Sequence, residues 1–199
     1  ITAGASFSND GDATENNGGT DFWIVKTDSS ANIVWQKSYG GSNDEHPYCI
    51  IASKTGGYIL IGNALSNDSD VTGNHGIDDI WIVKIDDNGN LEWQRCYGGS
   101  GNEIAFSIVC TSDSGYVFTG STTSNDGDVS GNKCNTLNSN AWIVKLNSSG
   151  TLEWQRCWGG TIGGDFARSF VETEDGYVVA STSNSTEGKV LGHRVGRDF

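Results

Sequence analysis

Acidic loops that recur along the chain contain residues whose types and spacing could bind a metal ion. Each loop carries two Asp residues two positions apart, within the pattern Asn-Asp-Gly/Ser-Asp. Oxygen ligands at alternate positions suit a hard cation such as Ca²⁺, because several of them must converge on one centre at short range. With Ca²⁺ as the one candidate cofactor, we predict these metal ligands: Asp10, Asp12, Asp68, Asp70, Asp126 and Asp128.

The same loops have a second interpretation that needs no ion. Asn, Asp and Gly form Asx-turns by themselves, and the loops lack the terminal bidentate Glu of an EF-hand. In the last copy Glu187 and Lys189 replace the paired Asp residues, and a Lys ammonium would repel a cation. We expect that copy to be empty, and for the other copies both interpretations stay open.

Other reactive residues do not assemble into a recognisable active site. His46, His75 and His193 are scattered at positions that do not match one another in the repeat described below, so neither a metal triad nor a Ser-His-Asp arrangement is indicated. Three adjacent carboxylate pairs could serve glycoside hydrolysis, but solvated turns explain them more simply. These pairs are Asp44-Glu45, Asp78-Asp79 and Glu174-Asp175. We predict that the chain has no catalytic residues and is not an enzyme.

Internal repetition supplies the elements that must position these loops. The segment Trp-Ile-Val-Lys at residues 23–26 returns at 81–84 and at 142–145. Trp-Gln, Gly-Gly and Gly-Tyr pairs follow each copy at matching positions. The second interval is three residues longer than the first, and the extra residues fall in the loop 133–140, where an insertion disturbs no strand.

Each repeat predicts four short strands. In the second repeat we expect strands at 80–85, 91–97, 104–111 and 116–122, because apolar residues run together or alternate there between Gly-containing turns. Four antiparallel strands in a unit of this length are typical of a propeller blade. The sequence therefore predicts an all-β fold, namely a β-propeller of four-stranded antiparallel blades, with an open solenoid as the competitor. We expect the recurring Trp residues to form the core between blades.

The repeat also predicts the organisation of the chain. We expect one repeat array over residues 1–199, with repeats at approximately 22–79, 80–140 and 141–198, and with 1–21 as the end of a preceding blade and its loop. Residues 1–4 align with 59–62, and residues 198–199 align with 79–80. We therefore expect three blades plus partial flanking strands, as a fragment of a larger propeller.

Composition narrows the class of partner. The formal net charge of −13 repels a phosphate backbone, so we expect no nucleic-acid partner. The longest apolar runs are too short to cross a bilayer, so we expect no membrane insertion. The five cysteines show no CxxC motif, and Cys96 and Cys157 share one repeat position, which favours semi-buried thiols over a disulfide framework.

The motifs together resemble a known repeat. The segments W-I-V-K, L-E-W-Q, Y-G-G, D-G-Y and S-N-D-G-D-V-S-G-N are similar to a tandem β-propeller-type repeat of secreted bacterial and archaeal surface proteins. The resemblance covers nearly the whole chain. It implies an extracellular or cell-surface module, and since proteins of this kind are often type IX secretion substrates, it also implies the secretion machinery as a partner.

These expectations define a function and its rival. We expect a non-enzymatic extracellular propeller module for binding, adhesion or scaffolding, which grips a protein or carbohydrate ligand with its loops. The alternative is a propeller enzyme that acts on polysaccharide in the manner of a glycosidase, with its site residues outside this fragment.

Overall fold

The structure is a computed structural model that describes residues 1–134 and 138–185. In these residues it contains thirteen β-strands and no helix, which confirms the predicted all-β class. None of the described segments is therefore a helix able to span a membrane. The strands are β1 (Thr2–Ser6), β2 (Asp21–Thr27), β3 (Ile33–Tyr39), β4 (Glu45–Ala52), β5 (Tyr58–Ala64), β6 (Asp79–Ile85), β7 (Leu91–Tyr97), β8 (Glu103–Cys110), β9 (Tyr116–Thr122), β10 (Asn140–Leu146), β11 (Leu152–Trp158), β12 (Asp165–Thr173) and β13 (Gly176–Ser183).

The strands of the second repeat lie close to their predicted positions. Strands β7 and β9 have the predicted bounds, whereas β6 and β8 each begin one residue earlier than the sequence predicted. The added residues are the acids Asp79 and Glu103, of which Asp79 was expected to be a solvated turn residue. Both become important in the candidate site.

Antiparallel pairing groups the strands into four sheets, in the orders β1-β2-β3, β4-β5-β6-β7, β8-β9-β10-β11 and β12-β13. The boundaries between these sheets lie about two strands, or half a repeat, away from the boundaries of the predicted repeats 22–79, 80–140 and 141–198. Strands β4 and β5 come from the first predicted repeat, and β6 and β7 come from the second. The chain crosses to the next sheet at the Gly-Gly turn after β7, whereas the long loop between β5 and β6 stays within one sheet.

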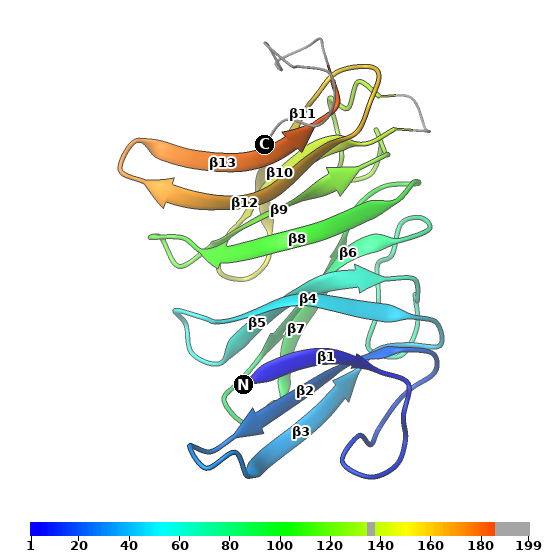
Figure 1. The fold of residues 1–199 in the computed structure, drawn as a ribbon, viewed down its shortest axis with the longest axis vertical. Helices are drawn as coiled ribbons and strands as arrows, with labels where there is room; N and C mark the ends of the chain where they lie inside the picture. The colour runs from blue at the N-terminus through cyan, green and yellow to red at the C-terminus, as the bar shows by residue number, and fades with distance from the viewer. Residues whose placement is uncertain (135–137, 186–199) are drawn as a thin grey trace.

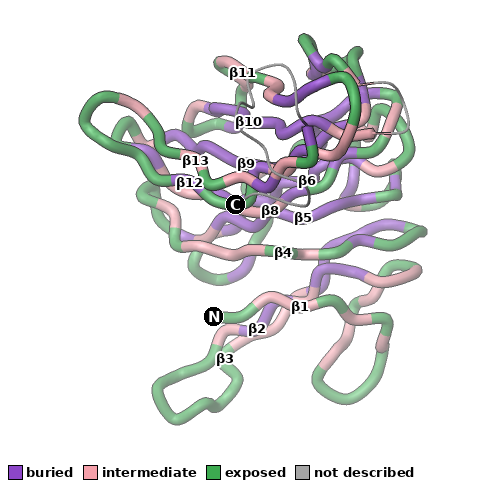
Figure 2. Tube along the Cα trace, turned by 45° about the horizontal axis from the view of Figure 1, so that its top comes forward, coloured by how far each residue is buried: buried purple, intermediate pink, exposed green. Residues whose placement is uncertain are grey.

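The four sheets stack in an open row (Figure 1). Strand β1 packs against β4, β5 packs against β8, and β9 packs against β12. Each sheet therefore contacts the first strand of the sheet that follows it in the chain. The two complete sheets in the middle have neighbours on both faces. Figure 2 shows this as burial concentrated in the strands of these sheets.

Strand β6 shows how both faces are filled. Trp81 and Val83 join Phe22 of β2 in one hydrophobic cluster, while Ile80 and Ile82 join residues of β9 and β10 in another. The Trp81 ring is fully buried and lies 4.7 Å from the Phe22 ring, measured between centroids. Burial on both faces explains the continuous apolar run. It confirms Trp81 and Trp142 as core between sheets, whereas the recurring Trp at 23, 35, 93 and 154 is only partly buried.

The long loops that connect β1 to β2, β5 to β6 and β9 to β10 all lie at one end of the stack, on the right in Figure 1. The hairpin turns that connect β2 to β3, β4 to β5 and β8 to β9 lie at the other end. Since each sheet has the same strand order, equivalent loops are brought to equivalent positions. The acidic loops are therefore displayed side by side along one end.

Candidate functional site

The acidic loops fasten one sheet to the next. Asp68 Oδ1 accepts a hydrogen bond from the Ser42 amide at 2.8 Å, and Asp126 Oδ1 accepts one from the Ser100 amide at the same distance. These amides belong to the Gly-Gly turns that end the preceding sheet. Hydrogen bonds from Ser42 and Ser100 lower the pKa of Asp68 and of Asp126, so each turn is held by an ionised carboxylate.

The second Asp of each pair binds a different part of the same turn. Asp70 Oδ2 lies 3.3 Å from the Gly40 amide, and Asp128 Oδ2 lies 3.3 Å from the Gly98 amide. In the first copy Asp10 and Asp12 are exposed.

The paired carboxylates are thus directed at separate amides. Within residues 1–134 and 138–185, no group of three or more His, Cys, Asp or Glu side chains is arranged to hold a metal ion. The last copy, with Glu187 and Lys189, lies outside the described residues. Binding of Ca²⁺ by the acidic loops stays a prediction.

Replacing Asp126 by Ala tests the two interpretations of these loops. We expect the variant to lose about 1–2 kcal/mol of unfolding free energy, because the Ser100 amide loses its carboxylate acceptor. The loss should be equal with Ca²⁺ and with a chelator, as read from thermal unfolding. Asp12→Ala, at an exposed position, is the matched control. A rise in melting temperature with Ca²⁺ that Asp126→Ala abolishes would instead establish a calcium loop.

Pairs of acids lie buried beneath the Gly-Gly turns. Glu45 and Asp79 are each fully buried, so the interpretation of these two residues as solvated turn positions is wrong. Glu174 and Asp175, the third pair, are exposed as predicted. A Cβ added to Gly98 would collide with both Asp79 Oδ1 and Glu103 Oε2, which shows that the two carboxyl groups converge on this glycine.

The pattern recurs in neighbouring sheets. Asp21 and Glu45 converge in the same way beneath Gly40, whereas Asn140 replaces the first acid and Asp165 the second beneath Gly159. The recurrence makes the pair a feature of the framework rather than of one ligand site.

In the pairs beneath Gly40 and Gly98, the Glu carboxyl group has a hydrogen-bond partner on both oxygens, whereas the Asp carboxyl group has one on a single oxygen. Glu103 Oε2 accepts from the Gly99 amide at 2.9 Å, and Asp79 Oδ2 accepts from the His75 amide at 2.9 Å. Asp79 Oδ1 and Asp21 Oδ1 are buried without a hydrogen-bond partner. Burial raises the pKa of Asp79 and Glu103, and it raises the pKa of Asp21 to about 6.

Asp21→Asn is expected to change how stability depends on pH. Between the ordinary pKa of 3.8 and about 6, folded Asp21 keeps a proton that the unfolded chain has released, so this residue's contribution to stability is lost as pH rises through 6. We expect the variant to gain about 2–3 kcal/mol over the parent at pH 7.5 and almost nothing at pH 4.

Urea unfolding of both proteins at the two pH values measures this difference. Asn is acceptable sterically because Asn140 occupies the equivalent position in the next sheet but one. Equal stabilities at pH 7.5 would contradict a raised pKa for Asp21 in the folded protein.

Two equivalent clefts open between neighbouring sheets beside these acids. The first cleft, between β1-β2-β3 and β4-β5-β6-β7, has a volume of about 360 Å³ and is lined by Tyr39, Asp70 and Gly89. The second cleft, between β4-β5-β6-β7 and β8-β9-β10-β11, has a volume of about 390 Å³. It is lined at matching positions by Tyr97, Asp128 and Gly150.

A hydrogen bond joins the sheets in both clefts. The Tyr39 hydroxyl donates to the Gly89 carbonyl, and the Tyr97 hydroxyl donates to the Gly150 carbonyl. The two clefts are therefore built around the same hydrogen bond between neighbouring sheets.

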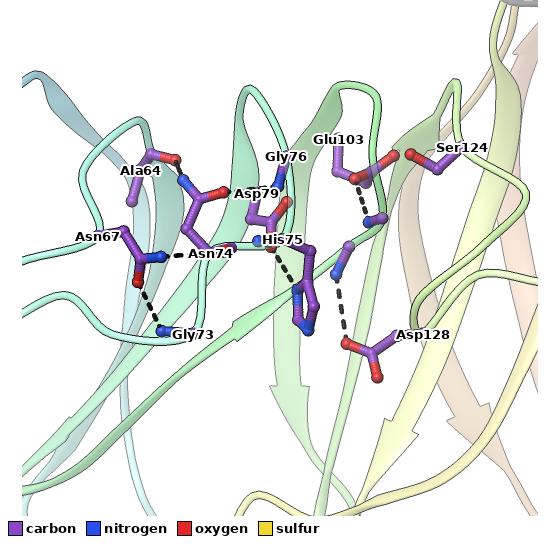
Figure 3. Close-up of polar contacts among 12 residues, drawn as sticks. Ala64, Asn67, Gly73, Asn74, His75, Gly76, Asp79, Glu103, Ser124 and Asp128 are labelled. Atoms are coloured by element: carbon purple, nitrogen blue, oxygen red, sulfur yellow. Dashed lines mark hydrogen bonds and ion pairs between the residues drawn. The ribbon is translucent and has the colours of Figure 1, made fainter.

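The second cleft holds a histidine that sequence reasoning did not connect with any partner. His75 Nδ1 lies 2.7 Å from Asp79 Oδ2, and Figure 3 shows the imidazole between Asp79 and Asp128. Asn17 occupies the equivalent position of the first cleft. The signal in the sequence is that His75 precedes Asp79 by four residues, but only the burial of Asp79 makes that acid a fixed partner.

The cysteine in the second cleft is not set up as a nucleophile. All five thiols are free, as the shared repeat position predicted for Cys96 and Cys157. Cys96 lines the second cleft but is buried, and burial raises the pKa of its thiol well above the ordinary range. A thiol in that state is a poor nucleophile, because the thiolate is the reactive form.

Comparison with known proteins adds no family to this description. No protein-family model matches the chain, and no curated protein matches it. The candidate site is therefore defined by its geometry alone.

Proposed function

We propose that the chain is part of a β-propeller of four-stranded antiparallel blades, and that it acts outside the cell as a non-enzymatic module for binding, adhesion or scaffolding. In this proposal the protein is exported, by a type IX-like route, to the cell surface or beyond. Its ligand is a protein or a carbohydrate held at the loop end of the blades. The stacked sheets with equivalent loops at one end support the architecture.

One observation carries the binding function, namely a constant cleft framework with varied side chains around it. Tyr39 and Tyr97 make the same bond between sheets, yet Asn17 in the first cleft is replaced by His75 in the second. A rigid scaffold that displays different residues at matching loop positions is typical of recognition surfaces.

The burial of the acid pairs supports a function without catalysis. Glycoside hydrolysis needs two carboxyl groups that reach the scissile bond from opposite sides. Asp79 and Glu103 are both fully buried beneath Gly98, so a sugar ring cannot lie between them.

The rival proposal is a propeller enzyme that acts on polysaccharide. The pairing of His75 with buried Asp79 favours it, because an oriented imidazole is the usual general base. Asp128, which lines the same cleft, would be the carboxylate partner of that imidazole.

A binding screen separates the two proposals. The chain is applied to arrays of immobilised polysaccharides and of extracellular proteins, and retained protein is measured together with soluble reducing ends. We expect retention on at least one ligand without release of sugar. Release of reducing ends that disappears in His75→Asn would support the enzyme, and retention on no ligand would contradict a binding module.

A further inference from the structure

The second cleft differs from the first in its charge. In the first cleft Lys37 Nζ lies 3.4 Å from Glu15 Oε2, so its charge is balanced by a neighbouring carboxylate. Arg95 occupies the position of Lys37 in the second cleft, but Gly73 stands where the first cleft has Glu15. Within the described part of the chain, Arg95 forms no ion pair with any carboxylate.

A second polar group, the His75 imidazole, faces the same cleft. The Nδ1 atom of His75 is held by Asp79, so the opposite ring nitrogen, Nε2, is left for a ligand. Asn17 in the first cleft has no such ring. The second cleft therefore combines an unpaired guanidinium with a fixed imidazole.

Further polar groups lie beside the guanidinium and the imidazole. Asp128 lines the cleft with one carboxylate oxygen, Oδ2, turned toward the Gly98 amide, which leaves Oδ1 to accept from a ligand. Thr151 also lines the cleft. The volume of about 390 Å³ lies in the range of about 300–1,000 Å³ that is usual for small-ligand sites.

We infer that the second cleft binds a carboxylate-bearing sugar, such as a uronic acid unit of an acidic polysaccharide. The Arg95 guanidinium forms paired hydrogen bonds with the sugar carboxylate, since its planar fork matches the two oxygens. His75 Nε2 and Asp128 Oδ1 accept from hydroxyl groups of the same sugar, because the imidazole proton sits on Nδ1 and is donated to Asp79. The net charge of −13 does not prevent this contact, because charges beyond about 8 Å are largely screened at physiological salt.

This inference rests on the proposed function and names the ligand class of that module. The probe is a trimer of galacturonic acid, and its methyl ester is the matched ligand without charge. We expect calorimetry to detect the acid and to find at least tenfold weaker binding of the ester, because a hydrogen bond to a charged group contributes about 1.5–3 kcal/mol. Equal affinity for acid and ester would overturn the inference.

Variants locate the site. Arg95→Gln removes the charge at an exposed position and should weaken binding of the acid at least tenfold, whereas Arg95→Lys should retain part of it. His75→Asn introduces the residue of the first cleft and should weaken binding several-fold. Lys37→Gln, at the equivalent position of the first cleft, is the control and should leave binding unchanged.

The outcomes separate this inference from the function on which it rests. Loss of binding in Lys37→Gln but not in Arg95→Gln would overturn the assignment to the second cleft. Retention of a neutral polysaccharide or a protein, without measurable binding of the trimer, would overturn the uronate inference and leave the binding module standing. Cleavage of the trimer would overturn the binding module itself.

Discussion

Trp81→Ala is expected to lower the free energy of unfolding by about 3–5 kcal/mol, the range for removal of a large aromatic side chain from a packed core. The indole is fully buried between two sheets, and its Nε1 donates to Gln94 Oε1 at 2.7 Å. The substitution removes both the ring contact with Phe22 and this bond. Urea unfolding measures the loss.

The matched control is Trp23→Ala. Trp23 has the same repeat position and the same bond to a Gln, at 3.1 Å, but it is only half-buried because no described sheet covers that face of β2. We expect it to cost less than half as much as Trp81→Ala. Equal losses would mean that contacts between sheets do not determine the stability of the fold.

Gly98→Ala is expected to destabilise the chain by about 3 kcal/mol, because the added methyl group has no free space. The new Cβ would meet Asp79 Oδ1 and Glu103 Oε2, and neither buried carboxyl group can move away without losing its backbone partner. The same measurement of urea unfolding applies.

Gly4→Ala controls for the general effect of a methyl group in a strand. No atom lies within 4 Å of the position that its Cβ would take, so we expect a change of less than about 0.5 kcal/mol. If Gly98→Ala were equally mild, the convergence of the two carboxyl groups beneath the turn would be incorrect.

The sequence was sufficient to predict the strands, and particular residues show why. Continuous apolar residues at 80–83 indicate a strand buried on both faces, and alternating apolar residues at 91–97 indicate a strand buried on one face. Both patterns can be recognised within a few neighbouring residues. Repetition at 23–26, 81–84 and 142–145 then placed the recurring Trp in the core, which its burial at Trp81 and Trp142 confirms. The propeller itself stays a proposal, because the described sheets form an open row.

Features that depend on contacts between distant residues could not be predicted. Glu45 and Asp79 have the composition of a turn, but the backbone amides of Gly41 and His75 supply hydrogen bonds that allow each acid to be buried. The grouping of strands into sheets was likewise missed, because the pairing of β5 with β6 crosses a predicted repeat boundary. The clefts follow from that pairing, since each forms where two sheets meet.

Amide hydrogen exchange tests most directly the claim that neighbouring sheets hold one another in place. Strands β6 and β10 lie inside complete four-stranded sheets and are fully buried. We expect their amides to exchange only through global unfolding, with one shared opening free energy, and those of β3 and β13 to exchange faster. Amides of β6 or β10 that exchange as fast as those of β13 would contradict the stacked-sheet account.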